Sequence, residues 1–519
     1  MRSWRERTEM HAILNPLSKH RTIAFAIVWA CSCTGGMAPD GEGPCNDAEL
    51  VDAVRAQLAA RDLAPLEAPE IRPELVALGE ALFYDKILSG GRDVSCATCH
   101  NPALGLTDRL TLNSGVKGEG VGPDRTGGQV GGRHTQTLFN MHLVENLTID
   151  GKVEEVDGNV IGLGLPVILP KYQAPFEDFA GVLAPHVVAG QAMLPEVTFS
   201  EMLGIPGTDE NNEILLCLDP EAALADIFGC MFDGYMARLR EIPGYVQLFE
   251  AAYPGVSIAD MNFGHAGNAI AAYELVAFAS VDSPWDRFIA GDDCALDDQE
   301  LQGAAIFFDE KRGNCASCHA GAAFTDSDFH NTLAPNFGCG NDLPGRNGAN
   351  GYDDFGRPRN DYAEAWVLDG QGDEAFPVEE RYRWRTAPLR NVEYTAPYGR
   401  LGQYATLEAF VSHYIDPETS LNEYDITQLS NATFVDYTTF MCSYDSLHDS
   451  LLGNSAEVIA AGPDPQLAEV EIDAAEDVGH LAAFLRALSE DALRPEELAK
   501  ISPATVPSGL SVDLSEPMY

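Results

Sequence analysis

The chain has 519 residues, enough for two to four domains with buried cores. Its charged fraction of 22% is ordinary for a globular protein, but 80 acidic residues against 32 basic ones give a net charge of −48. This charge excludes a nucleic-acid partner and docking on anionic lipid. It fits either steering of a cationic partner protein or a solvated surface suited to high salt or export.

Residues 1–33 have the pattern of an export signal. Basic side chains precede a short apolar stretch, Ile23–Ala30, which is too short to span a membrane as a permanent helix. Cys31 or Cys33 follows at once, in the setting of a lipoprotein cleavage site. We therefore expect export to the periplasm, either with a lipid anchor on one of these cysteines or after simple signal cleavage.

The next elements follow from apolar periodicity. Residues 34–64 are expected to form a linker and then a helix over Asp47–Arg61. Further helices are expected over Asn268–Ala279 and Ala474–Leu488, and the second of these has the one-sided apolar spacing of a core helix. The residues from Ser502 onward are expected to form a loose tail.

Two copies of one pattern, C-x-x-C-H, occur at Cys96–His100 and at Cys315–His319. This is the attachment pattern of a c-type haem, in which both thiols bond to the porphyrin and the histidine supplies an axial nitrogen to iron. Four zinc-binding cysteines or a thioredoxin-like redox pair are the alternatives, but a histidine follows both pairs, which favours haem. We predict two covalently bound c-type haems, held by Cys96, Cys99, Cys315 and Cys318, with His100 and His319 as axial ligands.

Similar segments precede both motifs. Leu78–Asp85 and Leu301–Asp309 each end in an aromatic residue followed by Asp, which indicates an internal repeat. We therefore expect a mainly α fold with two cytochrome c-like helical haem domains, long loops and an insertion in the first domain. The predicted domains are residues 65–292, with the insertion at about 156–235, and residues 293–500, followed by a tail at 501–519.

Eight cysteines lie outside the two motifs. Export favours disulfides, and Cys217 and Cys230, which are nearest in sequence, are predicted to pair. If Cys31 or Cys33 carries lipid, the other candidates, whose pairings are left open, are Cys45, Cys294, Cys339 and Cys442.

Further segments make the chain resemble the bacterial di-haem cytochrome c peroxidase/MauG family over roughly residues 65–489. The resemblance implies a di-haem peroxidase-type oxidoreductase with hydrogen peroxide as its substrate. It implies that His100 holds the peroxide-reacting haem and that His319 holds the electron-transfer haem. The segments similar to family motifs are Leu78–Asp85, Cys96–Pro102, Arg133–Asn140, Ser283–Phe288, Thr386–Val392 and Thr395–Tyr398.

The resemblance also implies two polar side chains in the first haem pocket. In the family a Gln and a Glu lie ten residues apart in Q-A-x-x-P…E-M, and Gln191 and Glu201 repeat that spacing. A carboxylate there can move a proton between the peroxide oxygens, and an amide can hold peroxide by hydrogen bonds. Gln191 and Glu201 are therefore the predicted catalytic residues.

The sixth ligand of the second haem distinguishes branches of the family, because peroxidases have Met there and the MauG branch has Tyr. The family pattern places Tyr414 at this position, with His413 as the adjacent rival and a buried, otherwise bonded tyrosine as the alternative. A phenolate favours Fe(III) and higher oxidation states, whereas a thioether raises the potential. Ligation by Tyr414 would therefore favour storage of oxidising equivalents.

Two departures from the family concern the first haem. The family's distal His is absent, since no histidine lies between His100 and His134, so we expect a five-coordinate iron. His134 replaces the Asn that binds the family's calcium ion, and imidazole is a poor calcium ligand. One calcium ion held by the carbonyls of Thr395 and Pro397 is left open, as is a role for His134 in the first haem pocket.

The third departure lies between the haems. Ile149 stands where the family has Trp, and an aliphatic side chain cannot be oxidised. The inserted residues could supply another aromatic side chain, such as Tyr172.

Three functions are therefore weighed. The first is a MauG-like oxidase that reacts with peroxide and takes electrons from a substrate such as a partner protein. The second is a cytochrome c peroxidase supplied by a small redox protein, and the third is a non-catalytic electron carrier. Tyr414 favours the first, whereas Ile149 weakens the first two. A homodimer is a further expectation, because the family is often dimeric.

Overall fold

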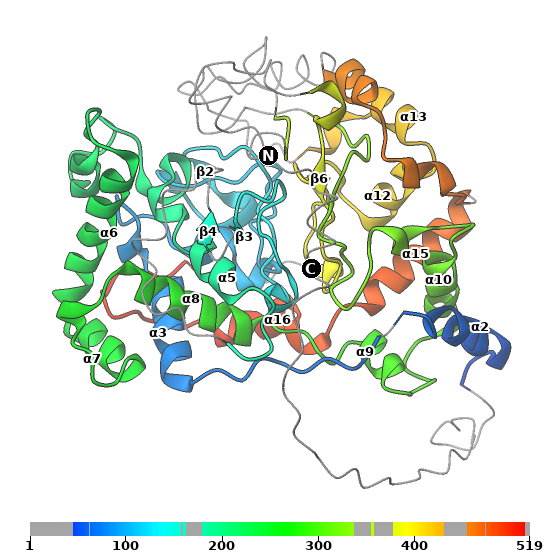
Figure 1. The fold of residues 1–519 in the computed structure, drawn as a ribbon, viewed down its shortest axis with the longest axis horizontal. Coiled ribbons are helices and arrows are strands. Elements are labelled where there is room, and N and C mark those ends of the chain that lie inside the picture. Colours follow the sequence, from blue (N-terminus) through cyan, green and yellow to red (C-terminus); the bar gives the residue numbers. More distant parts are fainter. Residues whose placement is uncertain are drawn as a thin grey trace, which may run out of the picture.

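The computed structural model describes residues 45–61, 63–156, 159–161, 179–336, 354–357, 377–429, 454–472 and 474–513. Several predictions, those on Cys31, Cys33, Tyr172, Cys339 and Cys442, fall outside these residues. Among the described residues, no helix has the length and apolarity needed to cross a membrane. Figure 1 shows two helical lobes side by side, with short strands near the boundary between them.

Helices form most of the regular structure, which confirms the mainly α prediction. The first lobe contains α3 (Pro73–Tyr84), α4 (Cys96–Cys99), α5 (Pro185–Gln191), α6 (Leu224–Arg240), α7 (Pro243–Ala252), α8 (Phe263–Ala277) and α16 (Pro495–Leu498). The second contains α2 (Ala48–Leu58), α9 (Pro284–Ile289), α10 (Asp298–Phe308), α12 (Leu407–His413), α13 (Pro417–Asn422) and α15 (Ala474–Ala487). Antiparallel pairs join β1 (Gly118–Glu119) to β2 (Thr126–Gly127), β3 (Glu154–Val156) to β4 (Asn159–Ile161), and β5 (Phe329–His330) to β6 (Trp384–Arg385).

The internal repeat corresponds to two equivalent helix crossings. A Cβ atom added at Gly79 would lie 1.8 Å from the carbonyl oxygen of Ala269, so α3 meets α8 with no room for a side chain. A Cβ atom added at Gly303 would lie 1.9 Å from the carbonyl oxygen of His480, where α10 meets α15. Each glycine lies six residues before the Asp that ends its segment. The repeat therefore encodes the same close packing before each C-x-x-C-H motif.

The predicted helices are found with shifted ends. Helix α8 begins at Phe263, five residues before the expected Asn268, because the side chain of Asn262 accepts a hydrogen bond from the N–H of Gly264 and caps the helix. Helix α15 extends to Ala487, and its predicted core side chains are buried in the second lobe. They are Val478, Leu481, Phe484, Leu485 and Leu488.

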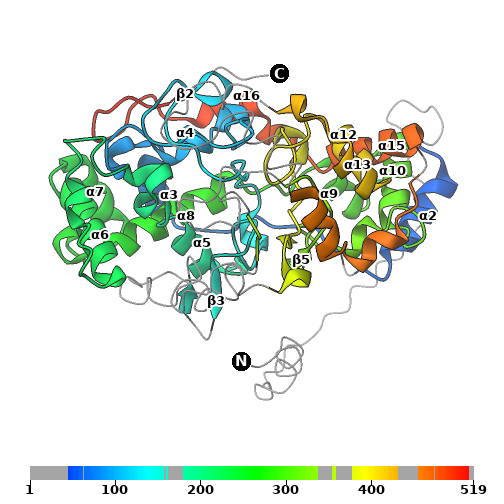
Figure 2. The ribbon, with the colours of Figure 1, turned by 90° about the horizontal axis from the view of Figure 1, so that it is seen from above.

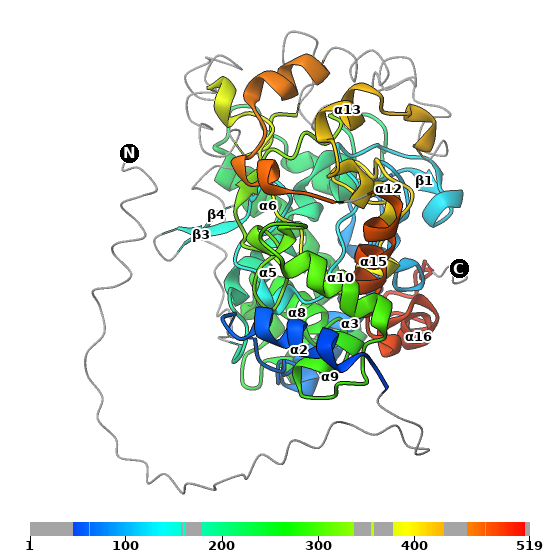
Figure 3. The ribbon, with the colours of Figure 1, turned by 90° about the vertical axis from the view of Figure 1, so that its right-hand side faces the viewer.

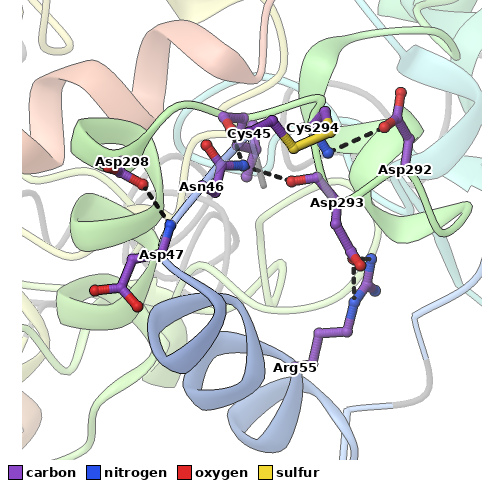
Figure 4. The surroundings of a disulfide bond; sticks show 9 residues. Cys45, Asn46, Asp47, Arg55, Asp292, Asp293, Cys294 and Asp298 are labelled. Carbon is purple, nitrogen blue, oxygen red and sulfur yellow. Dashed lines mark hydrogen bonds and ion pairs between the residues drawn. A yellow bond between two sulfur atoms is a disulfide. The ribbon is translucent and has the colours of Figure 1, made fainter. Parts of the chain in front are cut away.

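The N-terminal helix α2 packs in the second lobe, although it precedes the first lobe in sequence. Figure 3 shows it alongside α10, and a disulfide between Cys45 and Cys294 fixes its start (Figure 4). Arg55 adds an ion pair with Asp293, whose side-chain atoms lie 2.7 Å apart. The predicted Cys217–Cys230 disulfide is also present, linking the 3-10 turn before α6 to α6 itself.

The C-terminal segment returns from the second lobe to the first. Val506 is buried in the first core, and Ser508 donates its hydroxyl to Asp85 at 2.6 Å. Asp513 accepts a hydrogen bond from Thr98, inside the first motif, and pairs with Lys86, both at 2.6 Å. The expectation of a loose tail is wrong for residues 502–513, because this segment buries apolar area and partners polar groups of the first lobe. Figure 2 shows the ribbon of this segment running along the first lobe.

Candidate active site

The first C-x-x-C-H motif folds as one helical turn, α4, which a hydrogen bond from the Ser95 N–H to the Thr98 hydroxyl closes at 2.8 Å. Cys96 and Cys99 form no disulfide. The Nδ1 atom of His100 faces the carbonyl oxygen of Leu106 at 3.3 Å, which leaves Nε2 for a metal. Burial lowers the pKa of His100 to about 4, so the ring is neutral at physiological pH, as an iron ligand must be.

The second motif repeats this arrangement. The Nδ1 atom of His319 faces the carbonyl oxygen of Phe324 at 3.0 Å, and burial lowers the pKa of the ring. Cys315 and Cys318 are also free of disulfides. Two pairs of free thiols, each followed by a neutral, oriented imidazole, fit the donor set of a covalently attached c-type haem.

One cavity joins the first motif to the two predicted catalytic residues. Gln191, at the end of α5, and Glu201, in a π-helical turn over Phe199–Leu203, both line it. Within the described chain, the Oε1 atom of Gln191 is buried without a hydrogen-bond partner, which leaves an acceptor available for a ligand. Other residues that line the cavity are Cys96, Cys99, His100, Arg133, Ile149, Pro195, Met202 and Glu274.

The loop that contains Gly115, Val116 and Arg125 packs against the turn that carries Glu201. The N–H of Val116 donates to the carbonyl oxygen of Ser200 at 3.3 Å, and a Cβ atom at Gly115 would lie 1.9 Å from that oxygen. Arg125 fixes the loop by donating to the carbonyl oxygens of Ser114 and Gly115 at 2.7 and 2.6 Å. The loop carries no histidine, so it brings no imidazole to the cavity.

His134 lines the same cavity. Its Nδ1 atom lies 2.6 Å from the carbonyl oxygen of Leu110, and burial lowers its pKa to about 4. A neutral imidazole committed to a carbonyl offers little to a calcium ion. A calcium site formed by the carbonyl oxygens of Thr395 and Pro397 stays a prediction.

Tyr414 follows α12 and lies beside the second motif. Its pKa is raised by burial and, to a smaller extent, by the nearby Cys315 and Cys318 thiols. Both ring nitrogens of its rival His413 are occupied, Nδ1 by the Ser420 hydroxyl and Nε2 by the Thr332 carbonyl oxygen, each at 2.9 Å. Of the two, Tyr414 has the side chain that is close to both haem-binding thiols.

The chain is similar in sequence to known proteins. Residues 73–294 match the sequence model of the di-haem cytochrome c peroxidase family. Methylamine utilization protein MauG of Methylorubrum extorquens is 28% identical over 408 residues, which cover 76% of this chain and 85% of that protein. Cytochrome c551 peroxidase of Pseudomonas aeruginosa is 26% identical over 357 residues, covering 67% and 75%. Residues 73–294 thus match this family, and the chain is similar to MauG and cytochrome c peroxidases over two thirds or more of its length.

These similarities identify the protein as a di-haem peroxidase-type oxidoreductase, and the matched family implies two c-type haems. A crystal structure of a MauG-like protein associated with microbial copper homeostasis aligns with a TM-score of 0.49 and 21% identity, covering 83% of this chain and 96% of that one.

Three residues of this di-haem peroxidase were missed by sequence reasoning. Glu196 and Glu274 are buried carboxyl groups beside the first cavity. The available signal for Glu274 was its position as the single acidic residue within the apolar run Ala271–Ala277. Trp384 lies between the lobes on β6, and only the folded chain brings it beside Arg133 of the cavity wall, whose Cζ lies 5.2 Å from the ring centroid.

Proposed function

We propose that this protein reacts with hydrogen peroxide at the first haem and passes electrons through the second haem, in the manner of MauG. The observation that carries the proposal is the single cavity that joins Cys96, Cys99 and His100 to Gln191 and Glu201. A haem-binding motif and a proton-transfer carboxylate in one cavity suit peroxide reduction better than simple electron carriage.

Reduction of one peroxide to two waters consumes two electrons and two protons. When bound, the haem supplies an iron that binds peroxide and exchanges electrons. Glu201 moves a proton between the two peroxide oxygens, and Gln191 holds peroxide by hydrogen bonds to its side-chain amide. His100, oriented by the Leu106 carbonyl, would supply a ring nitrogen to hold the iron.

The position of Tyr414 supports the MauG-like form of the function. A phenolate ligand from Tyr414 would stabilise the oxidised second haem and so favour storage of oxidising equivalents. The electrons would then come from a slowly oxidised substrate, such as a side chain of a partner protein.

The acidic surface favours a second candidate, a cytochrome c peroxidase. A net charge of −48 attracts cationic redox proteins and speeds their encounter with the enzyme at low ionic strength. A small cytochrome or cupredoxin would then reduce the second haem after each turnover.

Three finer features belong to the proposal. The protein is exported to the periplasm and anchored through lipid on Cys31 or Cys33, it assembles as a homodimer, and one calcium ion is bound by the carbonyls of Thr395 and Pro397. Mass spectrometry of the mature N-terminus tests the lipid, light scattering tests the dimer, and metal analysis tests the calcium.

Stopped-flow spectroscopy of the ferric holoprotein with one equivalent of peroxide tests the main proposal. The resting spectrum is expected to show one high-spin and one low-spin haem, and peroxide is expected to oxidise both. A resting spectrum of two low-spin haems, or no reaction with peroxide, would overturn it. An oxidised product that persists until a substrate is added favours the MauG-like form, whereas rapid reduction by a cationic cytochrome favours the peroxidase.

A further inference from the structure

Two carboxyl groups are buried beside the first cavity. Glu274, on α8, lines the cavity and is 8% exposed. Glu196, in the 3-10 turn Pro195–Val197, is 0% exposed, and neither of its carboxyl oxygens has a hydrogen-bond partner among the described residues. A buried carboxyl group without a partner, such as that of Glu196, costs stability, so its presence beside a site points to a chemical role.

Burial favours the protonated form of both carboxyl groups. Burial raises the pKa of Glu274 to about 8. Burial raises the pKa of Glu196 well above its usual value, and the nearby carboxyl groups of Glu201 and Glu274 raise it further when they ionise. Glu196 is therefore electrostatically coupled to both the cavity carboxyl of Glu201 and the helical carboxyl of Glu274.

The surroundings do not supply a compensating cation. In the part of the chain that the structure describes, no Lys or Arg side chain bonds to either carboxyl group. Arg238 on α6 lies over the ring of Tyr235, which contacts Glu196. Its guanidinium, however, donates to the carbonyl oxygens of Ile87, Ser89 and Gly90 and to the carboxylate of Glu213.

Other titratable groups on the elements that pack around the pair have pKa values raised by burial. Tyr235 donates its hydroxyl to the backbone carbonyl oxygen of Glu196 at 2.8 Å, and burial raises its pKa. Cys96 on α4 feels the charges of both Glu196 and Glu274, but its thiol no longer titrates once haem is attached. On α3, Tyr84 and the half-buried Glu80 have pKa values raised by burial. Proton exchange by the pair is thus directed toward Glu201 and the cavity.

We propose that Glu196 and Glu274 form an internal proton reservoir that recharges Glu201 while peroxide is reduced at the first haem. The inference rests on the proposed function. The O–O bond breaks, two electrons arrive by way of the haems, and two protons complete the two waters. Glu201 delivers a proton to peroxide and regains one from the buried pair, which is refilled from solvent between turnovers.

The reservoir makes the reaction depend on pH in a defined direction. Below a pH of about 8 Glu274 holds its proton, and as the pH rises through that value the proton is lost. The rate of peroxide reaction should therefore fall above pH 8. The Glu274→Gln variant cannot release a proton from this side chain, so its reaction with peroxide should be about tenfold slower than that of wild type. This loss is smaller than the ~10²–10⁴-fold loss on removing a direct proton donor. The variant should also lose the decline in rate near pH 8.

The experiment compares the ferric holoproteins of wild type, Glu274→Gln, Glu196→Gln and the control Glu80→Gln, which changes a half-buried carboxyl group outside the cavity. Infrared spectra in H2O and D2O at pH 7 measure the carbonyl band of protonated carboxylic acids, and stopped-flow measures the peroxide reaction from pH 6 to 10. Glu274→Gln and Glu196→Gln should each lose part of the wild-type infrared band, and Glu80→Gln should retain the wild-type pH profile.

The two readouts separate the possible failures. The reservoir proposal would be overturned by an unchanged infrared band in both Glu274→Gln and Glu196→Gln, or by wild-type rates and a wild-type pH profile in both. A wild-type protein that does not react with peroxide at all would overturn the proposed function, whereas the infrared band would still report whether the pair is protonated. Covalent haem content per chain checks that each variant is folded.

Discussion

The backbone N–H of Arg385 donates to the carbonyl oxygen of Ile149 at 2.7 Å, and this bond joins strand β6 to the wall of the first cavity. On the same strand, Trp384 pairs across the sheet with His330, which lies within 4.8 Å of the ligand atoms of Cys318 and Asp326 in the second lobe. Arg400 stacks on the Trp384 ring with its Cζ 3.9 Å from the centroid. An oxidisable ring therefore lies between the two haem-binding motifs, although residue 149 is aliphatic.

Trp384→Leu should slow the oxidation of the second haem after peroxide is added by about tenfold or more, because the aromatic ring between the motifs is lost. The initial reaction at the first haem should keep its rate. Stopped-flow spectra that resolve the two haems measure both steps. Trp384→Phe is the matched control, since it retains a ring for Arg400 to stack on. Equal rates in wild type and Trp384→Leu would exclude Trp384 from the electron path.

Tyr414→Met should raise the reduction potential of the second haem. A thioether stabilises Fe(II), and axial ligands span a range of ~0.8 V, so a rise on the order of 100 mV or more is expected. Spectroelectrochemical titration of both haems measures the change, and the potential of the first haem is the internal control. An unchanged second potential would mean that Tyr414 is not the ligand.

Glu201→Gln should slow the reaction with peroxide by ~10²-fold or more, because an amide cannot carry a proton between the peroxide oxygens. Both haems should stay bound with wild-type resting spectra. Rapid mixing with peroxide measures the rate, and Glu250→Gln, an exposed change on α7, is the control. A wild-type rate would remove Glu201 from the mechanism.

Asp513→Asn should lower the free energy of unfolding of the first lobe by roughly 1–3 kcal/mol, because it weakens a largely buried ion pair with Lys86 beside the first haem motif. Urea titration followed by first-haem absorbance measures the loss. Glu497→Gln removes the exposed ion pair with Lys500 and should change stability by less than ~1 kcal/mol. Equal stabilities of Asp513→Asn and wild type would mean that the C-terminal segment does not support this lobe.

His142→Leu should make the protein less sensitive to acid. Burial, with a smaller contribution from Arg390, lowers the pKa of His142 to about 4, while its unfolded value is about 6.5. Between these values the unfolded chain binds a proton that the folded chain refuses, so stability falls as the pH drops through this window. Wild type should lose about 1.4 kcal/mol per pH unit through this residue.

Unfolding free energies between pH 4 and 7 measure the difference. Among the described residues neither ring nitrogen of His142 has a hydrogen-bond partner, so the variant should be at least as stable as wild type at pH 7. His413→Leu is the comparison, because it also removes a buried neutral histidine but breaks hydrogen bonds to Ser420 and Thr332. A slope equal to that of wild type in His142→Leu would contradict the assignment.

Local patterns determined much of the site. The C-x-x-C-H motifs place two thiols and an imidazole on one turn of chain, so their chemistry needs no distant partner. The resemblance to the family's Q-A-x-x-P…E-M segment predicted that Gln191 and Glu201 share the first haem pocket, and both line one cavity. The disulfide between Cys217 and Cys230 followed from proximity in sequence, since closing a short loop costs little entropy.

Only the tertiary structure decided which segments cross between the lobes. The sequence predicted a loose tail after Ser502 because that segment is short and lacks a periodic pattern, but Val506 and Asp513 find partners in the first lobe. Likewise Glu196 and Trp384 contact residues far away in the sequence, Tyr235 and His330, and Glu274 meets the first haem motif only in the folded chain. Burial and long-range pairing depend on the whole fold, because a side chain's environment is set by what packs against it and not by its neighbours in sequence.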